Sequence, residues 1–543
     1  MKSGDTPMKR PPLELERNDL ARLEQAAARG ATRRDLLRML LAMGILGPVA
    51  SGLAGTAQEA LAQTPKRGGR VRVAGISSST ADTLDPAKAS LSTDYMRHYM
   101  LYSGLTQLDA SLTPQLALAD EIRQDKAQTW TFRLRKDVTF HDGSALTPAD
   151  VVYSLSRHKA PATASKVKTV SEQFTEVKAV GANEVQVRLA TPNADLPVIL
   201  AASHFVIVKD GTTDFTSANG TGPFKLKEFR PGVRTLVTRN ERYWRPGRPY
   251  VDEIELIGIP DEPARVNALL AGDVQLVLAV DPRSTTRVKA SPGHGVLETK
   301  SGLYTDLVIR QDVAPGNSPD FTLAMKYLLD REQVRSAIFR GFAQVANDQP
   351  LPPGHRYHFA GLPQRPHDPD KAKFHLQKAG VGSGPFTVVA APAATGSIDM
   401  AVLLQQSAKK AGLTLNVNRV PSDGYWSNHW MKHPLGFGNI NPRPSADLLF
   451  TQFFKSDAPW NESGWKNEKF DQLLLAARAE PDETKRKQLY ADMQILVHEK
   501  CGIGIPVFMS FIDGFSNKVK GLGSIPLGGL MGYMFSEHVW LDG

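Results

Sequence analysis

The sequence predicts an α/β fold, because segments with helical periodicity alternate with short segments typical of strands. Each helix in this pattern ends at a glycine, the residue that most easily takes the left-handed conformation found after a helix. A strand-like segment then follows at once. Three units share this order of helix, glycine and strand: 261–270, Gly272 and 274–279; 371–379, Gly380 and 386–390; 398–411, Gly412 and 413–420.

The remaining elements agree with a mixed sheet. Alternating apolar and polar residues predict strands over 71–74 and 130–135. Thr147 and the proline that follows it begin a helix. A long helix over 482–499 precedes a buried strand over 503–508.

Length and composition narrow the class of protein. The chain has 543 residues, which allows about two to four domains, and 41% hydrophobic with 22% charged residues excludes wholesale disorder and a polytopic membrane protein. Its one cysteine, Cys501, excludes an intrachain disulfide and a cysteine-based zinc or iron–sulfur site. We expect Cys501 to be a buried structural thiol.

The charge of the chain does not indicate a nucleic-acid partner. The 65 basic residues nearly balance the 56 acidic ones, for a net charge of +9. The one basic cluster, 66–72, is short and runs into a strand pattern.

The first sixty residues resemble a twin-arginine export signal. Arg33 and Arg34 precede an apolar, charge-free stretch over 39–57, and a small-x-small cleavage site follows at 60–62. Leu36 stands where phenylalanine is commonest. We expect cleavage after Ala62 and a periplasmic mature chain that the twin-arginine translocase exports. An uncleaved anchor is the alternative, because the stretch nearly reaches the roughly 20 residues that span a bilayer.

Separate blocks of the mature chain resemble the extracellular solute-binding proteins of peptide and nickel ABC importers, called family 5. The longest block, 138–154, is close to the family signature over its whole length. Other blocks follow in the family's order: 68–74, 83–87, 101–106, 220–224, 240–244, 262–272 and 330–331.

This resemblance implies a two-lobed clamshell with a hinge and no enzymatic activity or cofactor. It places lobe I, with an inserted subdomain, at 63–296 and again at 505–543, and lobe II at 297–504. The implied function is capture of a peptide-like or other small solute by a monomer that delivers it to ABC permease and ATPase subunits. An exported cofactor- or metal-binding protein, including an enzyme, and a ligand-sensing receptor subunit remain alternatives.

Two histidine patterns have other interpretations. His141 and Asp142 precede a glycine, which favours a tight turn over a catalytic dyad. His429 and His433 stand four residues apart, a spacing that can put two imidazoles on one face of a helix, and His355 and His358 flank a proline-rich loop. No carboxylate–histidine cluster or cysteine pair accompanies either pair. We expect no metal site.

The segment 425–465 is the predicted binding wall, since four of the seven tryptophans lie there among polar residues. In peptide-binding relatives, the stretch matching 439–447 usually carries an aspartate for the ligand's amino group. Here Arg443 stands about there and Asp447 comes later, so an anionic solute is the better prediction. A structural Arg443, paired for example with Asp447, is the alternative. The predicted ligand-binding residues are Arg443, Asn439, Asn441, Trp426, Tyr425, Trp460, Ser78, Ser79 and Tyr304.

Overall fold

A computed structural model describes residues 65–77 and 79–542 of the chain. The predicted export signal and its cleavage site lie outside these residues. Within the described ranges, no helix is long and apolar enough to cross a membrane.

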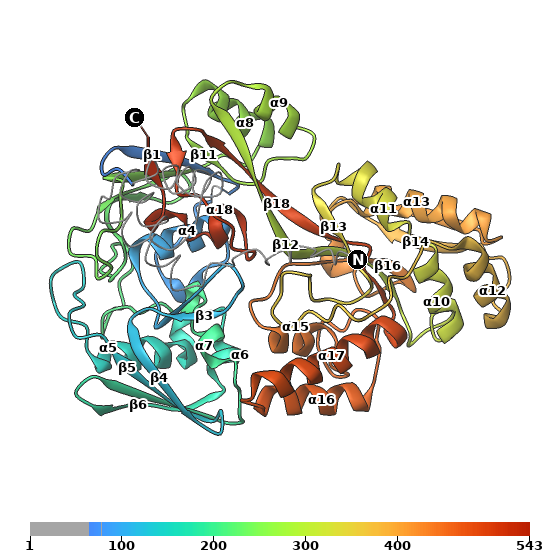
Figure 1. Cartoon of the computed structure of the whole chain (residues 1–543), viewed down its shortest axis with the longest axis horizontal. Coiled ribbons are helices and arrows are strands. Elements are labelled where there is room, and N and C mark those ends of the chain that lie inside the picture. Colours follow the sequence, from blue (N-terminus) through green and yellow to red (C-terminus); the bar gives the residue numbers. More distant parts are fainter. Residues whose placement is uncertain (1–64, 78, 543) are drawn as a thin grey trace, which may run out of the picture. The chain divides into compact units, whose positions relative to one another are not determined.

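One large mixed sheet organises the chain, and two of its strands extend through both halves of the molecule (Figure 1). These strands, β12 (His294–Ile309) and β18 (Val507–Ser516), pair antiparallel from His294 opposite Ser516 to Leu303 opposite Met509. The register is interrupted between Lys300 and Leu303. The other strands of the sheet are β1 (Arg70–Gly75), β8 (Phe224–Arg230), β9 (Arg234–Arg239), β10 (Glu253–Gly258), β11 (Leu276–Val277), β13 (Ala343–Val345), β14 (Phe386–Ala390), β15 (Leu415–Arg419), β16 (Leu435–Ile440) and β17 (Ile503–Gly504).

We call the half built on β1 and β8–β11 lobe I, and the half built on β14–β16 lobe II. The strand order β15-β14-β16-β12-β18-β11-β1-β10-β9-β8 places the two crossing strands between the lobes. The lobe boundaries predicted at 296/297 and 504/505 lie in β12 and just before β18, and this division stays a prediction.

Lobe I carries a subdomain with a sheet of its own, ordered β4-β5-β7-β6. Its strands are β4 (Ala119–Asp125), β5 (Thr129–Leu134), β6 (Phe174–Gly181) and β7 (Glu184–Leu189). Two small sheets pair β2 (Thr106–Leu108) with β3 (Pro114–Leu116) and β19 (Val519–Lys520) with β20 (Trp540–Leu541).

Helices cover the sheets of both lobes. Those of lobe I are α4 (Ser92–Leu101), α5 (Pro148–Ser156), α6 (Lys168–Ser171), α7 (Leu196–Ile199), α8 (Glu262–Ala271), α9 (Thr285–Ala290) and α18 (Gly529–Gly532). Those of lobe II are α10 (Pro319–Tyr327), α11 (Arg331–Gln333), α12 (Pro369–Ala379), α13 (Ser397–Lys410), α14 (Tyr425–Asn428), α15 (Ala446–Phe453), α16 (Glu468–Ala479) and α17 (Glu483–Lys500).

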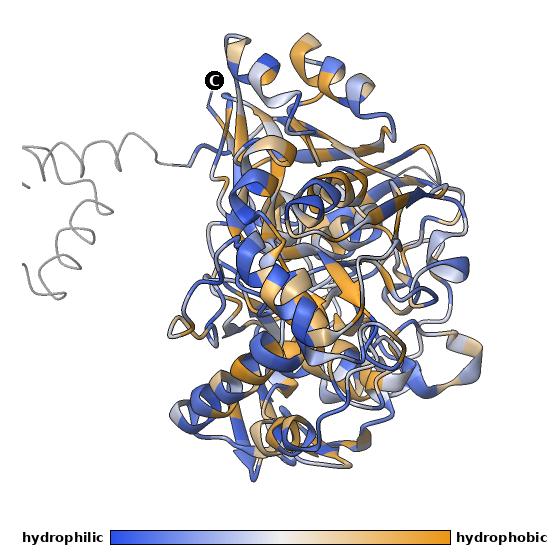
Figure 2. Ribbon diagram, turned by 90° about the vertical axis from the view of Figure 1, so that its right-hand side faces the viewer, coloured by the Kyte–Doolittle hydropathy of each residue, from blue (hydrophilic) through white to orange (hydrophobic). Residues whose placement is uncertain are grey.

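Each lobe has its own apolar cores. In lobe II, successive residues of β12 point to opposite faces of the sheet. Leu307 packs into the core that α10, α12 and α13 cover, and Val308 into the core under α15–α17. Figure 2 shows hydrophobic residues gathered toward the interior, while the helices alternate between hydrophobic and hydrophilic residues.

The structure confirms the order helix, glycine and strand in all three predicted units, although the strand predicted over 274–279 is only β11, Leu276–Val277. Gly272, Gly380 and Gly412 all have positive φ after their helices. Asp142 accepts a hydrogen bond from the Ser144 backbone at 2.8 Å, as a turn residue does. The predicted strand over 503–508 is wrong in its extent, since β17 ends at 504 and β18 starts at 507.

Cys501 is buried, as predicted. Its thiol lies 3.6 Å from the Ser463 hydroxyl, and burial raises the pKa of Cys501 to about 11. The thiol therefore stays protonated and unreactive at neutral pH.

Two buried carboxyl groups face each other inside lobe II. Asp306 of β12 is fully buried, and Glu462 is 3% exposed and accepts a hydrogen bond from the Trp430 indole at 2.5 Å. Among the described residues, no other group donates to the Asp306 oxygens, so a proton on the pair must satisfy them. Burial and the adjacent Glu462 raise the pKa of Asp306 well above its usual range, and burial raises the pKa of Glu462 to about 7.

This pair predicts that the protein loses stability as the pH rises from about 4 to about 7. The unfolded chain releases these protons near pH 4, whereas the folded chain keeps the Glu462 proton to about pH 7 and also keeps the Asp306 proton well above its ordinary range. For each proton that only the folded chain retains, the free energy of unfolding falls by up to about 1.4 kcal/mol per pH unit. Glu462→Gln keeps an acceptor for Trp430 and can donate to Asp306. Its melting temperature should exceed that of the wild type at pH 8, and its pH dependence should be flatter.

Melting curves measured between pH 5 and 8.5 test this, with the exposed Glu499→Gln as control. A Glu462→Gln protein with the pH slope of the wild type would show that the pair does not titrate in this range.

Candidate functional site

A pocket lies between the lobes at the point where the crossing strands lose register. Its volume is about 100 Å³, room for several water molecules. Leu112 and Pro526 line it from lobe I, and Lys300, Ser301 and Gly302 come from β12 itself. Lobe II contributes the remaining walls: Gln344, Pro350, Leu351, Pro352, Gly354, His355, Pro442, Arg443 and Leu449.

The walls of this pocket are mainly prolines and leucines. Gly302 allows the close approach of the two proline-bearing segments, because a Cβ there would stand 3.3 Å from Pro352 Cγ and 3.9 Å from Pro442 Cβ. A small number of polar groups among apolar side chains is the composition of sites for small molecules.

One wall belongs to a long irregular segment, residues 346–368, which connects β13 to α12 and which we call the strap. A segment without strand or helix pairing needs other partners for its backbone. Its two ends meet, since the Arg365 amide donates to Asn347 Oδ1 at 2.9 Å and Asn347 Nδ2 to the Pro363 carbonyl at 3.0 Å.

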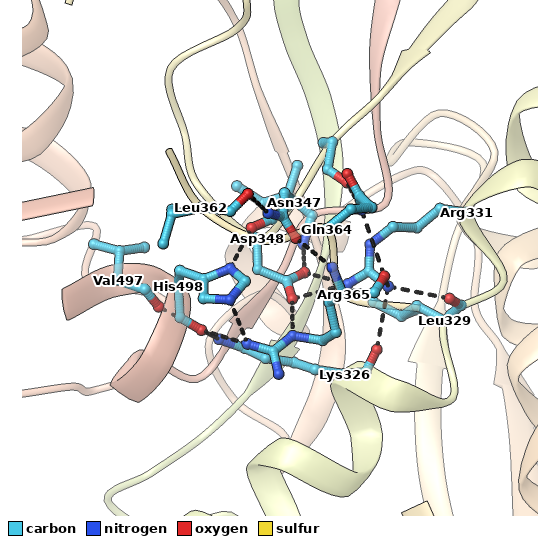
Figure 3. Close-up of polar contacts among 12 residues, drawn as sticks. Lys326, Leu329, Arg331, Asn347, Asp348, Leu362, Gln364, Arg365, Val497 and His498 are labelled. Carbon is cyan, nitrogen blue, oxygen red and sulfur yellow. Dashed lines mark hydrogen bonds and ion pairs between the residues drawn. The ribbon is translucent and has the colours of Figure 1, made fainter. Parts of the chain in front are cut away.

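A buried carboxylate fastens the strap to lobe II (Figure 3). Asp348 accepts hydrogen bonds from Arg331 at 2.7 and 2.8 Å, from Arg365 at 2.8 Å and from the Ile505 amide at 3.0 Å. Burial alone would raise the pKa of Asp348, but the surrounding cations outweigh it and lower the pKa to about 2. The group is therefore ionised, and removing one partner from such a buried pair typically costs about 3–5 kcal/mol.

The same cluster reaches the end of α17. Arg365 also donates to the His498 ring and carbonyl, both at 3.0 Å, and His498 Nδ1 lies 2.7 Å from the Asn347 carbonyl. Lys326 donates to the His498 carbonyl at 3.0 Å. These bonds hold the strap where Pro350 to His355 face the pocket.

Arg443 is the predicted site residue that lines the pocket. Its Nε donates to Gln452 Oε1 at 2.8 Å and its Nη1 to the Asn441 carbonyl at 3.0 Å, while its guanidinium lies over the Phe453 ring. No carboxylate among the described residues pairs with it. Asp447, the example of a structural partner, instead pairs with Arg478 at 2.8 Å.

The charge of Arg443 is consequently only partly satisfied. A guanidinium has five N–H donors, and only two interactions with acceptors are made within the described part of the chain. Burial lowers the pKa of Arg443 from its ordinary value, but a guanidinium stays charged in proteins. Leu112 and Pro526 of lobe I line the same pocket, so Arg443 has donors to spare at a site between the lobes.

The other predicted residues lie in different surroundings. Tyr304 and Tyr425 are each 1% exposed and belong to the cores of lobe II, so neither presents a side chain to the pocket. Asn439 donates to Thr305 Oγ1 at 2.8 Å, and Asn441 contacts Arg443 through its carbonyl.

Trp426 and Trp460 are 42% and 40% exposed and do not line the pocket. Ser79 closes a turn by accepting a hydrogen bond from the Ala81 amide at 3.0 Å, and Ser78 lies outside the described residues. The structure therefore brings only the segment around Arg443 to the pocket.

The histidines considered as metal ligands form hydrogen bonds within the protein. His429 and His433 stack and share a hydrogen bond of 3.2 Å, and His358 lies 2.8 Å from the Leu351 carbonyl. Within the described part of the chain, no three metal-ligating side chains converge.

Sequence reasoning missed most of the pocket. The strap residues Pro350, Leu351 and Pro352 come from a segment with no motif, and Leu112 and Pro526 come from opposite ends of lobe I. The one available signal was the run of prolines between 350 and 353, which rules out regular structure there.

Comparisons with known proteins agree with this architecture. The HbpA2 structure from Haemophilus parasuis superimposes with a TM-score of 0.78 at 20% identity, covering 88% of this chain and all of that one. The periplasmic binding protein DppA from Helicobacter pylori, solved with the peptide STSA, gives a TM-score of 0.72 at 22% identity, covering 88% of this chain and 99% of that one. Both show the same two-lobed fold.

The sequence comparisons are more specific. The chain is 26% identical over 474 residues to the dipeptide-binding protein of Escherichia coli, covering 79% of this chain and 87% of that protein. It is also 26% identical over 461 residues to heme-binding protein A of Haemophilus influenzae, covering 77% and 82%. A family model described as "Bacterial extracellular solute-binding proteins, family 5 Middle" matches residues 111–462. The chain therefore belongs to the bacterial extracellular solute-binding proteins of family 5.

Proposed function

We propose that this protein is the solute-binding subunit of an ABC importer. It captures a small solute between its lobes and presents it to a permease, and partner subunits hydrolyse ATP. The observation that carries this proposal is the pocket at the crossing strands, lined from both lobes in a chain of family 5. Relatives named for dipeptides, heme and glutathione support a small organic solute.

The pocket favours a solute with an anionic group on an apolar body. Its charged lining residues, Lys300 and Arg443, are both cations, and no carboxylate from the described part of the chain lines it. A half-buried guanidinium without a counter-ion gains most from a carboxylate or phosphate, which it can bind through two parallel hydrogen bonds. The proline and leucine walls suit the apolar remainder.

Mass spectrometry of the solute released from gently purified protein tests this function directly. An organic anion should be recovered in near-stoichiometric amount. A solute with an unpaired ammonium group and no anionic group would contradict the chemical class, and a covalently transformed substrate would contradict the transport role.

Replacing Arg443 should weaken binding of that solute. A hydrogen bond to a charged group is worth about 1.5–3 kcal/mol, so Arg443→Ala should raise the dissociation constant roughly 10- to 150-fold. Arg443→Lys should recover only part of the affinity, because lysine keeps the charge and loses the planar fork. Titration calorimetry measures the dissociation constants of the wild type, Arg443→Ala and Arg443→Lys.

The melting temperature of Arg443→Ala should fall only modestly, because the variant loses two hydrogen bonds and the contact with Phe453 but no ion pair. Arg310→Ala is the matched control: this arginine of lobe II pairs with Asp312 away from the pocket, so its loss should leave affinity unchanged. If Arg443→Ala binds as tightly as the wild type, the anionic class is wrong.

We further propose that the mature protein acts as a periplasmic monomer after twin-arginine export, on the basis of Arg33, Arg34 and the site ending at Ala62. Replacing both arginines with lysine should leave precursor in the cytoplasm. Cell fractionation with N-terminal sequencing measures this, and normal export of the variant or a mature terminus far from Gln63 would contradict it.

A further inference from the structure

The lobes also touch at a second place, away from the crossing strands. There the residue before α7 in the subdomain of lobe I, Asp195, enters lobe II. Its side chain is fully buried, and its oxygens accept hydrogen bonds from Arg486 at 2.8 Å, from Arg356 at 3.2 Å and from the Ser445 hydroxyl. The neighbouring Ala194 amide donates to the Arg478 carbonyl at 2.9 Å.

Lobe II holds its side of this contact in place independently of lobe I. Arg486 of α17 donates to the Ala477 carbonyl at 3.0 Å and to the Tyr357 hydroxyl at 2.9 Å. Its guanidinium also lies over the rings of Tyr357 and Tyr490. The arginine is therefore oriented before the carboxylate arrives, which reduces the entropy lost on contact.

In this contact an ionised carboxylate, Asp195, meets two guanidinium groups, those of Arg486 and Arg356. Burial alone would raise the pKa of Asp195, but Arg486 and Arg356 outweigh it, so the pKa lies below its ordinary value. Asp195 is thus ionised at neutral pH. Because its acceptor bonds to lobe II exist only while the lobes touch, they bias the equilibrium toward the closed form.

Two of the three residues that donate to Asp195 lie close in sequence to residues that line the pocket. Ser445 caps α15 two residues after Arg443, and Arg356 follows His355 in the strap. When Asp195 binds these donors, it fixes the ends of two segments that line the pocket.

We propose that Asp195 is a closure latch, which holds the lobes together through Arg486, Arg356 and Ser445 and thereby positions the Arg443 segment and the strap around the solute. The latch itself requires no solute. Only its effect on affinity rests on the proposed function.

A distance measurement between the lobes tests the latch. Val180 of β6 and Leu475 of α16 are 42% and 53% exposed, one on each side of the contact, and can be replaced by cysteine for spin labels. Cys501 is buried and should stay unlabelled. Distances are measured by pulsed electron resonance on protein that has been unfolded, dialysed and refolded to remove any solute.

Asp195→Asn should lower the ratio of short to long distances roughly 10- to 150-fold, the range expected when a charged hydrogen bond is lost. The matched control is Asp85→Asn, since Asp85 pairs with Arg157 at 2.8 Å wholly within lobe I and should affect only the melting temperature. Equal distance distributions in wild type and Asp195→Asn, or an equal shift in both variants, would overturn the proposal.

If Asp195→Asn fails to fold, Arg356→Gln tests the latch in its place. This variant removes one donor to Asp195, and Arg356 is less buried than Asp195, so the variant should fold more readily. It should shift the distances in the same direction by a smaller factor, and no shift would overturn the latch. Affinity for the co-purifying solute should fall with the closed population. A distance shift without loss of affinity would leave the latch standing and contradict capture between the lobes.

Discussion

The structure depends on the pairing of β12 with β18, because this one antiparallel ladder belongs to both lobes. Its regular part runs from His294 opposite Ser516 to Lys300 opposite Ser510 and continues the sheet of lobe I through the pairing of β18 with β11. Beyond the register break, β12 pairs with β16 and β18 with β13, so the ladder divides as it enters lobe II. The pocket forms where it divides, and residues 300–302 belong to the pocket for that reason.

A second constraint is the fastening of the strap. This segment has no ladder or helix to hold it, yet its prolines form a wall of the pocket. Buried charges hold it instead: Asp348 of the strap accepts hydrogen bonds from Arg331 near the start of lobe II. Arg365 of the strap pairs with Asp348 and also donates to His498 of α17. Asp348 can stay ionised in the interior because two arginines pair with it. Asp306 and Glu462 of the same lobe form no ion pair with a described cation, so these two carboxyl groups must hold a proton.

Much of the fold could be predicted from sequence, because its signals are local. Helix termination at Gly272, Gly380 and Gly412 depends on the backbone freedom of one residue, and the strands that follow have their own periodicity. The binding wall was less predictable. A tryptophan-rich segment has the composition of a site, but composition does not distinguish a core position such as Tyr425 from a surface position such as Trp426.

Arg443 could be proposed from the sequence because its segment resembles that of family members and carries an arginine where an acid is usual. Its role in binding stays a prediction. The strap and the roles of Asp195 and Asp348 could not be predicted from the sequence. Their roles arise from contacts across long sequence separations, 291 residues for Asp195 with Arg486, and no local pattern encodes such a pair. In a single sequence, the residues of a buried ion pair look like ordinary surface charges.

Hydrogen–deuterium exchange tests the central claim, that the solute lies between the lobes at the crossing strands. Protein carrying its co-purified solute is compared with protein refolded without it. In the protein with solute, amide hydrogens should gain protection mainly in segments 300–302, 350–355 and 442–449, which contribute residues to the pocket. Unchanged exchange in these segments, with protection only on the open surface around 336–342, would place the solute elsewhere and contradict the account.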